Sequence, residues 1–383
     1  MSIFLFYLFQ AAALAAGSPW PDVSSAPKGE KIDGSQDAAL IVSIEDYAFV
    51  SDIEGAQQNG RDWYQWVTKS QGLSAGNVAL IENEKATKEA IMKEAKRLSE
   101  SASQGKLWFV FIGHGAPAPN GKDGLLLGSD VQQTADSLGA RGVSQEELID
   151  VLEAQGASVV AVIDACFSGQ SSDGKALVEG LQPLIATTDL NVGSSVVLSA
   201  AKHDEFAGPL PGLERPAFSY LALGALRGWG DLDSSGTVSP DEVVAYSKDA
   251  LLGVLYGRTQ TPNVRGATEE VVLSRGTEDG PDLAAIRYEL TPVSKDIYKL
   301  GGAIAKGSMI TSLVVMTTGV VFWQVAEKIN KVETERFDRV KTTGDALFVT
   351  GFTLLPSAAV LYTGIKVVQK KKDETKKDGR GKK

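Results

Sequence analysis

Cysteine and histidine are both scarce in this sequence. Its 383 residues include one cysteine, Cys166, and two histidines, His114 and His203. A single cysteine cannot form a disulfide within the chain, and it cannot build a metal site from several thiolates. Two roles remain open for Cys166: an inert thiol, which is the usual role of a buried free cysteine, or a reactive thiolate.

Positive charge is also sparse over most of the chain. The net charge is -10, yet residues 366–383 contain nine Lys/Arg and only three Asp/Glu, so the rest of the chain is strongly acidic. Phosphate binding needs a basic face, so this charge distribution argues against nucleic acid as a partner. Hydrophobic residues make up 43% of the sequence, which is enough for a sizeable core without cross-links.

Three apolar segments flank the acidic body. Residues 1–16 are predicted to be a signal peptide, or a short apolar segment, because an apolar run ends at the small residues Ala13-Leu14-Ala15. Residues 307–326 and 346–365 lack charges and are each long enough to cross a bilayer, so we expect two transmembrane helices. The alternative is a pair of buried helices in a soluble domain.

The segments between these parts are predicted from composition. Residues 17–36 are expected to form a flexible leader, residues 276–306 a linker and residues 366–383 a basic tail. A cleaved signal would export the body, whereas the basic tail favours the cytoplasm. We therefore expect a membrane protein with an exported body, and the side of the membrane stays open.

The body, residues 37–275, alternates between apolar runs and amphipathic stretches. This pattern predicts an α/β domain with a doubly wound, mostly parallel sheet flanked by helices. The expected strands are Ala38–Ile44, Val78–Ile81, Leu107–Gly113, Ser158–Ile163 and Ser194–Ala200. The expected helices are Glu54–Lys69, Thr87–Ser101, Ser144–Glu153, Pro216–Trp229 and Pro240–Leu252.

Two rare residues directly follow two of these strands. His114 follows Leu107–Gly113, and Cys166 follows Ser158–Ile163 closely. Ligands of doubly wound sheets bind at the carboxyl ends of the strands, so both side chains are expected at the same edge. The sequence therefore predicts that His114 and Cys166 share one site.

The two residue types suit acyl-transfer chemistry. A thiol attacks a carbonyl carbon as the thiolate, and a histidine can take the thiol proton and later protonate the leaving amine. The backbone N–H groups of Gly115 and Cys166 are candidate donors to the oxyanion. Each residue could instead be structural, and His203, in a charged stretch after a later strand, is the alternative base.

The two turns resemble the catalytic motifs of the caspase and metacaspase superfamily. The resemblance lies in Gly113-His114-Gly115 and in the run from Asp164 to Gly169, Asp-Ala-Cys-Phe-Ser-Gly. The histidine and the cysteine are about 50 residues apart, as in caspases. This resemblance implies a caspase-like fold and cysteine endopeptidase activity on a protein or peptide substrate.

The resemblance also implies a specificity. An acid two residues before the nucleophile, here Asp164, is similar to metacaspases, which cleave after Arg or Lys. The segment from Asn59 to Asp62 resembles a helix start of that group and makes Asp62 a second acid for the substrate pocket. Phe167 stands where metacaspases commonly have His, and Arg61 adds positive charge nearby, so both depart from the pattern. The alternative is that both acids are structural.

Residues 231–242 match the twelve-position calcium loop of an EF-hand. Gly236 occupies the position of the sharp turn, and helical patterns flank the loop. The oxygen ligands expected for Ca²⁺ are Asp231, Asp233, Ser235, Thr237 and Glu242. Such an ion would be structural or regulatory; the alternative is an acidic turn that binds nothing.

The sequence thus favours a membrane-tethered cysteine endopeptidase that cleaves after Arg or Lys, with Cys166 and His114 as catalytic dyad. The rigid loop Phe206–Gly212 is expected near the site, where it would help to shape substrate binding. An inert caspase-like scaffold, or a calcium-responsive interaction module at a membrane, is the alternative from another class. The same chemistry also permits acyl transfer to an acceptor other than water.

Overall fold

The computed structural model describes most of the body of the chain. The described residues are 18–25, 32–102, 105–118, 123–167, 195–202, 205–266 and 271–290. The chain divides into two units after Leu290, and all of the described residues lie in the first unit.

Several predictions from the sequence fall on other residues. The signal segment 1–16, His203, the two apolar segments 307–326 and 346–365 and the tail 366–383 lie outside the described residues. Within the described ranges, no helix has the length and apolar character needed to span a bilayer.

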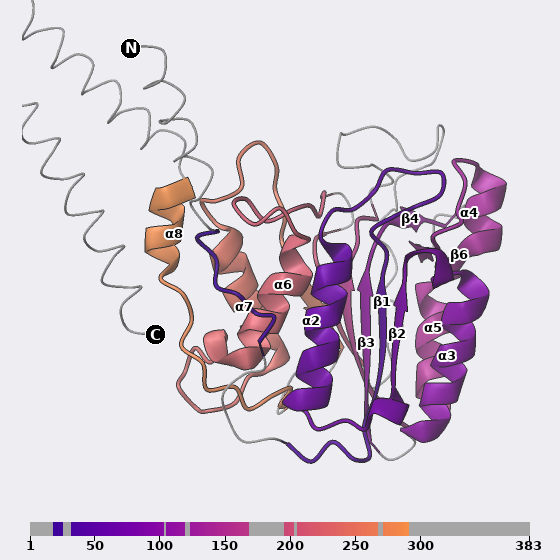
Figure 1. Cartoon of the computed structure of the whole chain (residues 1–383), viewed down its shortest axis with the longest axis horizontal. Coiled ribbons are helices and arrows are strands. Elements are labelled where there is room, and N and C mark those ends of the chain that lie inside the picture. The colour runs from indigo at the N-terminus through magenta and orange to yellow at the C-terminus, as the bar shows by residue number, and fades with distance from the viewer. Residues whose placement is uncertain are drawn as a thin grey trace, which may run out of the picture. The chain divides into compact units, whose positions relative to one another are not determined.

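A six-stranded sheet forms the centre of the first unit (Figure 1). Its order is β2-β1-β3-β7-β8-β9, and each neighbouring pair is parallel except β8 with β9. The strands are β1 (Ala38–Ser43), β2 (Val78–Glu82), β3 (Lys106–Ile112), β7 (Ser158–Asp164), β8 (Val196–Ser199) and β9 (Asn263–Arg265). The predicted doubly wound, mostly parallel sheet is confirmed.

Both faces of the sheet are buried, which explains the nearly continuous apolar runs. Successive side chains of a strand point to opposite faces, so β3 divides its residues between two cores. One core receives Trp108, Val110 and Ile112, and the other receives Leu107, Phe109 and Phe111.

Helices cover each face of the sheet (Figure 1). The first core contains buried residues of α2 (Ala56–Lys69), α6 (Ala217–Gly224) and α7 (Pro240–Leu251). The second contains buried residues of α3 (Lys88–Ser101) and α5 (Gln145–Glu153). Side-chain caps mark three of the helix starts that the sequence predicted: Thr87 for α3, Ser144 for α5 and Ser239 for α7.

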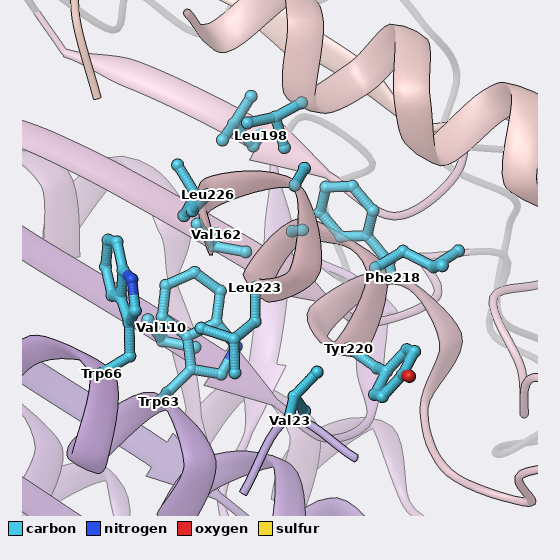
Figure 2. Packing of buried hydrophobic residues seen from close by; sticks show 14 of the residues in the cluster. Val23, Trp63, Trp66, Val110, Val162, Leu198, Phe218, Tyr220, Leu223 and Leu226 are labelled. Atoms are coloured by element: carbon cyan, nitrogen blue, oxygen red, sulfur yellow. The ribbon is translucent and has the colours of Figure 1, made fainter. Parts of the chain in front are cut away.

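Aromatic rings fill the core between α2 and the sheet. Trp63 and Trp66 of α2 pack edge to face at 5.5 Å, and Trp66 meets Trp108 at 5.1 Å. Figure 2 shows Trp63 and Trp66 beside Val110 and residues of α6. Edge-to-face pairs contribute more to the stability of a core than the burial of their apolar area alone. These rings therefore stabilise the packing of α2 and α6 on this face of the sheet.

Shorter elements escaped the sequence pattern. They are β4 (Gly115–Pro117), β5 (Gly124–Leu127), β6 (Gly142–Ser144), α4 (Ala135–Arg141), η1 (Ala75–Asn77), η2 (Asn83–Lys85) and α8 (Leu283–Leu290), together with β9. The predicted helix Pro216–Trp229 covers α6 and the π-type turn η3 (Ala225–Trp229). β4, β5 and β6 form a separate antiparallel sheet. Strands of three or four residues are too short to establish a periodicity, which is why they were missed.

Two segments expected to be loose are packed against the domain. In the predicted leader, Trp20 and Val23 are 4% and 1% exposed. In the predicted linker, Ile286 of α8 is buried, and Glu278 pairs with the buried Arg227. The folded unit therefore extends beyond residues 37–275 at both ends.

Candidate active site

The register of two central strands places His114 and Cys166 at one level. Ile112 of β3 pairs with Asp164 of β7, and each candidate residue lies two positions further along its own strand. Both side chains line one cavity of about 250 Å³. The other residues that line it are Asp52, Ile53, Glu54, Gly113, Asp164, Ala165, Phe206, Ala207, Gly208, Pro209, Glu214 and Pro216.

The imidazole of His114 is held by the loop that follows β1. Its Nε2 lies 2.7 Å from the carbonyl oxygen of Ser51, which can only accept a hydrogen bond. Its backbone N–H donates to the hydroxyl of Tyr47 at 2.8 Å, and the Tyr47 ring lies 4.8 Å from the imidazole. Burial lowers the pKa of His114, opposed by the hydrogen bond to Ser51 and by Asp52. The neutral ring thus carries its proton on Nε2. Nδ1 has no hydrogen-bond partner among the described residues, so it can accept a proton.

The thiol of Cys166 is clasped by the backbone of Ala207. The Ala207 N–H donates to Sγ at 2.8 Å, and the thiol donates to the Ala207 carbonyl oxygen at 2.9 Å. Burial raises the pKa of Cys166 to about 12, aided by the charge of Asp164 and opposed by the Ala207 N–H and Arg258. Within the described part of the chain, no hydrogen bond joins Cys166 to His114. The resting thiol is therefore protonated.

Gly115 lies close to the backbone of Cys166. Leu127 N–H donates to the His114 carbonyl, so Gly115 and Leu126 form a non-hydrogen-bonded pair of the β4–β5 ladder. The Gly115 N–H accordingly points away from β5. A β-carbon at Gly115 would lie 2.6 Å from the carbonyl oxygen of Cys166, so only glycine allows this approach. This geometry is compatible with the oxyanion role predicted for Gly115 and Cys166.

Asp164 is a buried residue that lines the cavity. Its Oδ2 accepts hydrogen bonds from the N–H and the hydroxyl of Ser219, each at 2.7 Å. Burial raises the pKa of Asp164, while the Ser219 hydrogen bonds and the charge of Arg258 act in the opposite direction. The cavity is also lined by the exposed acids Asp52, Glu54 and Glu214, and no Lys or Arg is among its described lining residues.

The structure corrects the prediction for Asp62. Its side chain is fully buried, forms an ion pair with Arg215 and accepts a hydrogen bond from Gln58 at 2.8 Å. It is not among the residues that line the cavity. Because the guanidinium of Arg215 already neutralises it, Asp62 is a structural anchor and leaves no charge for a substrate. Arg61 pairs with Glu82 on the surface, so it does not enter the cavity either.

Several residues of the site were missed in the sequence. Tyr47, Ser51 and Asp52 follow β1, so the same rule of strand ends that located His114 could have located them. No sequence pattern indicated that Arg258 belongs to the site. It donates to the carbonyl oxygens of Phe206 and Pro209, at 3.3 and 2.6 Å, and braces the segment that clasps the thiol.

Three of the five predicted calcium ligands lie close together in the EF-hand-like loop. Asp231, Asp233 and Glu242 each offer one oxygen, and these oxygens lie within 4.8 Å of one another. Oxygen ligands of Ca²⁺ lie about 2.3–2.6 Å from the ion, so this spacing fits one ion between them. Gly236 has φ of 80°, the left-handed turn expected at its position. The hydroxyl of Ser235 lies 3.3 Å from the Thr237 carbonyl oxygen, so the other two predicted ligands are neighbours.

No curated protein matches the chain. Among solved structures, caspase-1 from Spodoptera frugiperda is similar at 14% identity, with a TM-score of 0.43 over 68% of this chain and 96% of that one. The structure titled pro-sf-caspase-1 is similar at 13% identity, with a TM-score of 0.42 over 67% and 96%.

A family comparison covers more than half of the sequence. The family described as caspase domain matches residues 36–298, which include both strand ends, the cavity and the EF-hand-like loop. Membership supports cysteine-type peptidase activity on a protein substrate in general terms. The chain belongs to the caspase domain family.

Proposed function

We propose that this protein is a cysteine endopeptidase that cleaves after arginine or lysine, with Cys166 as nucleophile and His114 as general base and acid. One observation carries the proposal: His114, Cys166 and Asp164 line the same cavity. A nucleophile, a base and a carboxylate able to pair with a cationic side chain thus meet in one place.

The reaction begins when a substrate displaces Ala207 from the sulfur. Nδ1 of His114 takes the thiol proton, and the thiolate attacks the carbonyl carbon of the scissile bond. The N–H groups of Gly115 and Cys166 donate to the resulting oxyanion. The imidazolium, held by Ser51, then gives its proton to the leaving amine. Water activated by His114 finally hydrolyses the thioester and restores the thiol.

The preference for a basic residue rests on the charge of the cavity. Asp164 forms hydrogen bonds with Ser219, and its burial weakens competition from water for a bound cation. Asp52, Glu54 and Glu214 add negative charge around it. A carboxylate of a substrate would meet four acids here, so cleavage after an acidic residue is disfavoured.

Reporter peptides with Arg, Lys or Asp before the cleaved bond test this specificity. Asp164→Asn is expected to lower kcat/KM for the Arg reporter about 10–100-fold, because it removes one charge-assisted interaction of about 1.5–3 kcal/mol. The matched control is Asp130→Asn, since Asp130 pairs with Arg141 and does not line the cavity. Faster turnover of the Asp reporter by the wild type would contradict the proposed specificity.

The alternative is an inert caspase-like scaffold. It predicts no turnover of any reporter, with or without calcium, and no difference between the wild type and Cys166→Ala. The retained thiol, imidazole and oxyanion geometry favour the enzyme, because a scaffold needs none of them. Acyl transfer to an acceptor other than water would appear as a ligated product when an amine competes with hydrolysis.

We also propose that the EF-hand-like loop holds a Ca²⁺ ion through Asp231, Asp233 and Glu242, with Ser235 and Thr237 as further ligands. Three carboxylates favour a modest affinity, with Kd in the range of about 0.1–1 mM. Calcium at 10 mM is then expected to stabilise the folded chain by about 1.4–2.7 kcal/mol, measured as a rise in Tm. The role of such an ion would be to fix the loop before α7.

Asp233→Asn should remove most of this rise in Tm, because it deletes a ligand charge. Asp241→Asn is the matched control, since Asp241 lies in the same loop but outside the cluster of acids. An equal rise in the wild type, in both variants and with Mg²⁺ would contradict a specific calcium site.

Attachment to a membrane remains part of the proposal through residues 307–326 and 346–365. Their uncharged sequences support it, as does the basic segment 366–383, while export of the catalytic domain rests on the apolar segment 1–16. Fractionation of cells that express the full chain, followed by protease protection of the catalytic domain, would test the attachment and the side together.

A further inference from the structure

A short hairpin carries part of the cavity wall. This pocket hairpin, Pro209–Pro216, is closed by a bridge between its two end residues, and Leu210 N–H donates to the Arg215 carbonyl at 2.8 Å. At its tip, the N–H groups of Leu213 and Glu214 both donate to the Leu210 carbonyl at 3.0 Å. Pro209, Glu214 and Pro216 line the cavity, so the hairpin shapes the entrance for a substrate.

The base of the pocket hairpin is anchored to α2. Arg215 forms an ion pair with Asp62, and its Nε donates to Asn59 at 2.6 Å. Asn59 in turn donates to the Pro216 carbonyl at 2.9 Å. These bonds fix one end of the hairpin, but they do not reach its tip at residues 211–213.

The tip is held by a segment almost 200 residues earlier in the chain. The indole N–H of Trp20 donates to the carbonyl oxygen of Pro211 at 2.9 Å. Pro19 also lies against Gly212, where a β-carbon would approach its ring to 3.2 Å. Trp20 is 4% exposed, so this hydrogen bond is shielded from competing water.

This segment, Ser18–Ser25, is itself fastened to the domain, and we name it the strap. The hydroxyl of Tyr220 donates to the Pro21 carbonyl at 2.5 Å. Arg227 donates to the carbonyl oxygens of Val23 and Ser25, at 3.1 and 2.6 Å. Figure 2 shows Val23 close to the residues of α6. The strap therefore connects the tip of the hairpin to α6 and η3.

Glu214 shows why such a connection is needed. Its φ of 56° lies in the left-handed region, which a residue with a side chain adopts only when its surroundings enforce it. Its exposed carboxylate lines the cavity beside Asp52 and Glu54. A free tip would let Glu214 relax to an ordinary conformation and would move its charge.

We propose that the strap is a positioning element of the peptidase: through Trp20 it fixes the tip of the pocket hairpin and keeps Glu214 where it binds a basic substrate residue. The substrate class in this inference rests on the proposed function. The positioning of the hairpin by the strap rests on the hydrogen bonds alone. Trp20 itself does not line the cavity, so it acts through the hairpin.

Trp20→Phe in the full chain tests the inference, because it keeps an aromatic ring and removes only the indole donor. We expect KM for the Arg reporter to rise about 3–10-fold with kcat changed less than about twofold. Amide hydrogen exchange at Leu213 and Glu214 should accelerate at least about tenfold. Ile91→Val is the matched control, because Ile91 is buried in the other core and outside the strap: it should lower Tm through lost packing but leave KM and the exchange at these amides unchanged.

The two measurements separate the two proposals. Hydrogen exchange needs no catalysis, so it tests the strap even if the chain hydrolyses no reporter. Unchanged exchange at Leu213 and Glu214 in Trp20→Phe would overturn the inference. So would faster exchange at these amides in Ile91→Val to the same extent, because the effect would then follow general destabilisation.

Discussion

Replacing Cys166 with alanine is expected to lower kcat/KM for an Arg reporter by at least about 10⁴-fold, and His114→Ala by about 10²–10⁴-fold. The first change removes the nucleophile, and the second removes the only described group positioned to take its proton. Because the two residues act as a unit, the double variant should be no slower than Cys166→Ala within error. Steady-state kinetics with active-site titration measures all three losses.

His203→Ala supplies the control for this experiment. It is the only other histidine of the sequence and the alternative base, so its replacement should change kcat/KM less than about threefold if His114 is the base. A large loss in His203→Ala with activity retained in His114→Ala would overturn the assignment. Circular dichroism and Tm of each variant separate lost chemistry from lost folding.

Alkylation of the resting thiol is expected to be about 1000-fold slower in the native protein than in the same chain unfolded in urea. Burial raises the pKa of Cys166 from 9.0 to about 12, and only the thiolate reacts. The sign follows directly: a raised thiol pKa lowers the thiolate fraction at every pH below it. The native rate should therefore increase about tenfold per pH unit up to that pKa.

The sequence makes this measurement unusually direct. Cys166 is the only cysteine, so iodoacetamide reports one thiol in both states without any further substitution. An Arg-containing peptide electrophile should label the native protein faster than iodoacetamide does, because its binding displaces Ala207 from the sulfur. Native labelling as fast as in urea would mean that the resting protein already carries a thiolate.

The sequence predicted that His114 and Cys166 share one site, because this location follows from a general property of parallel sheets. Two long apolar strands, β3 and β7, were recognisable from their residues alone, and their carboxyl ends had to meet. The chemistry of Cys166 and His114 then needed only residue types. These inferences required no knowledge of contacts between distant segments.

The rest of the site depends on such contacts. Asp62 was interpreted as a pocket acid because its partner, Arg215, lies 153 residues later and carries no motif. The clasp of Ala207 on Cys166 involves backbone atoms, which any residue provides. The strap was taken for part of a flexible leader because residues 17–36 as a whole are rich in Ser, Pro, Gly and charge, although Trp20 and Val23 are buried. Sequence patterns describe local preferences, whereas these features arise from tertiary packing.

The residues proposed to react and the residues proposed to admit a substrate follow different strands. His114 and Cys166 leave the sheet at the same level of β3 and β7, so a twist of the sheet moves them together. Ala207 and the pocket hairpin instead follow β8, the next strand along. Mutations after β8 can thus change selectivity or latency while the proposed dyad keeps its geometry. Within one fold, substitutions in this region could change the substrate specificity and leave the catalytic residues as they are.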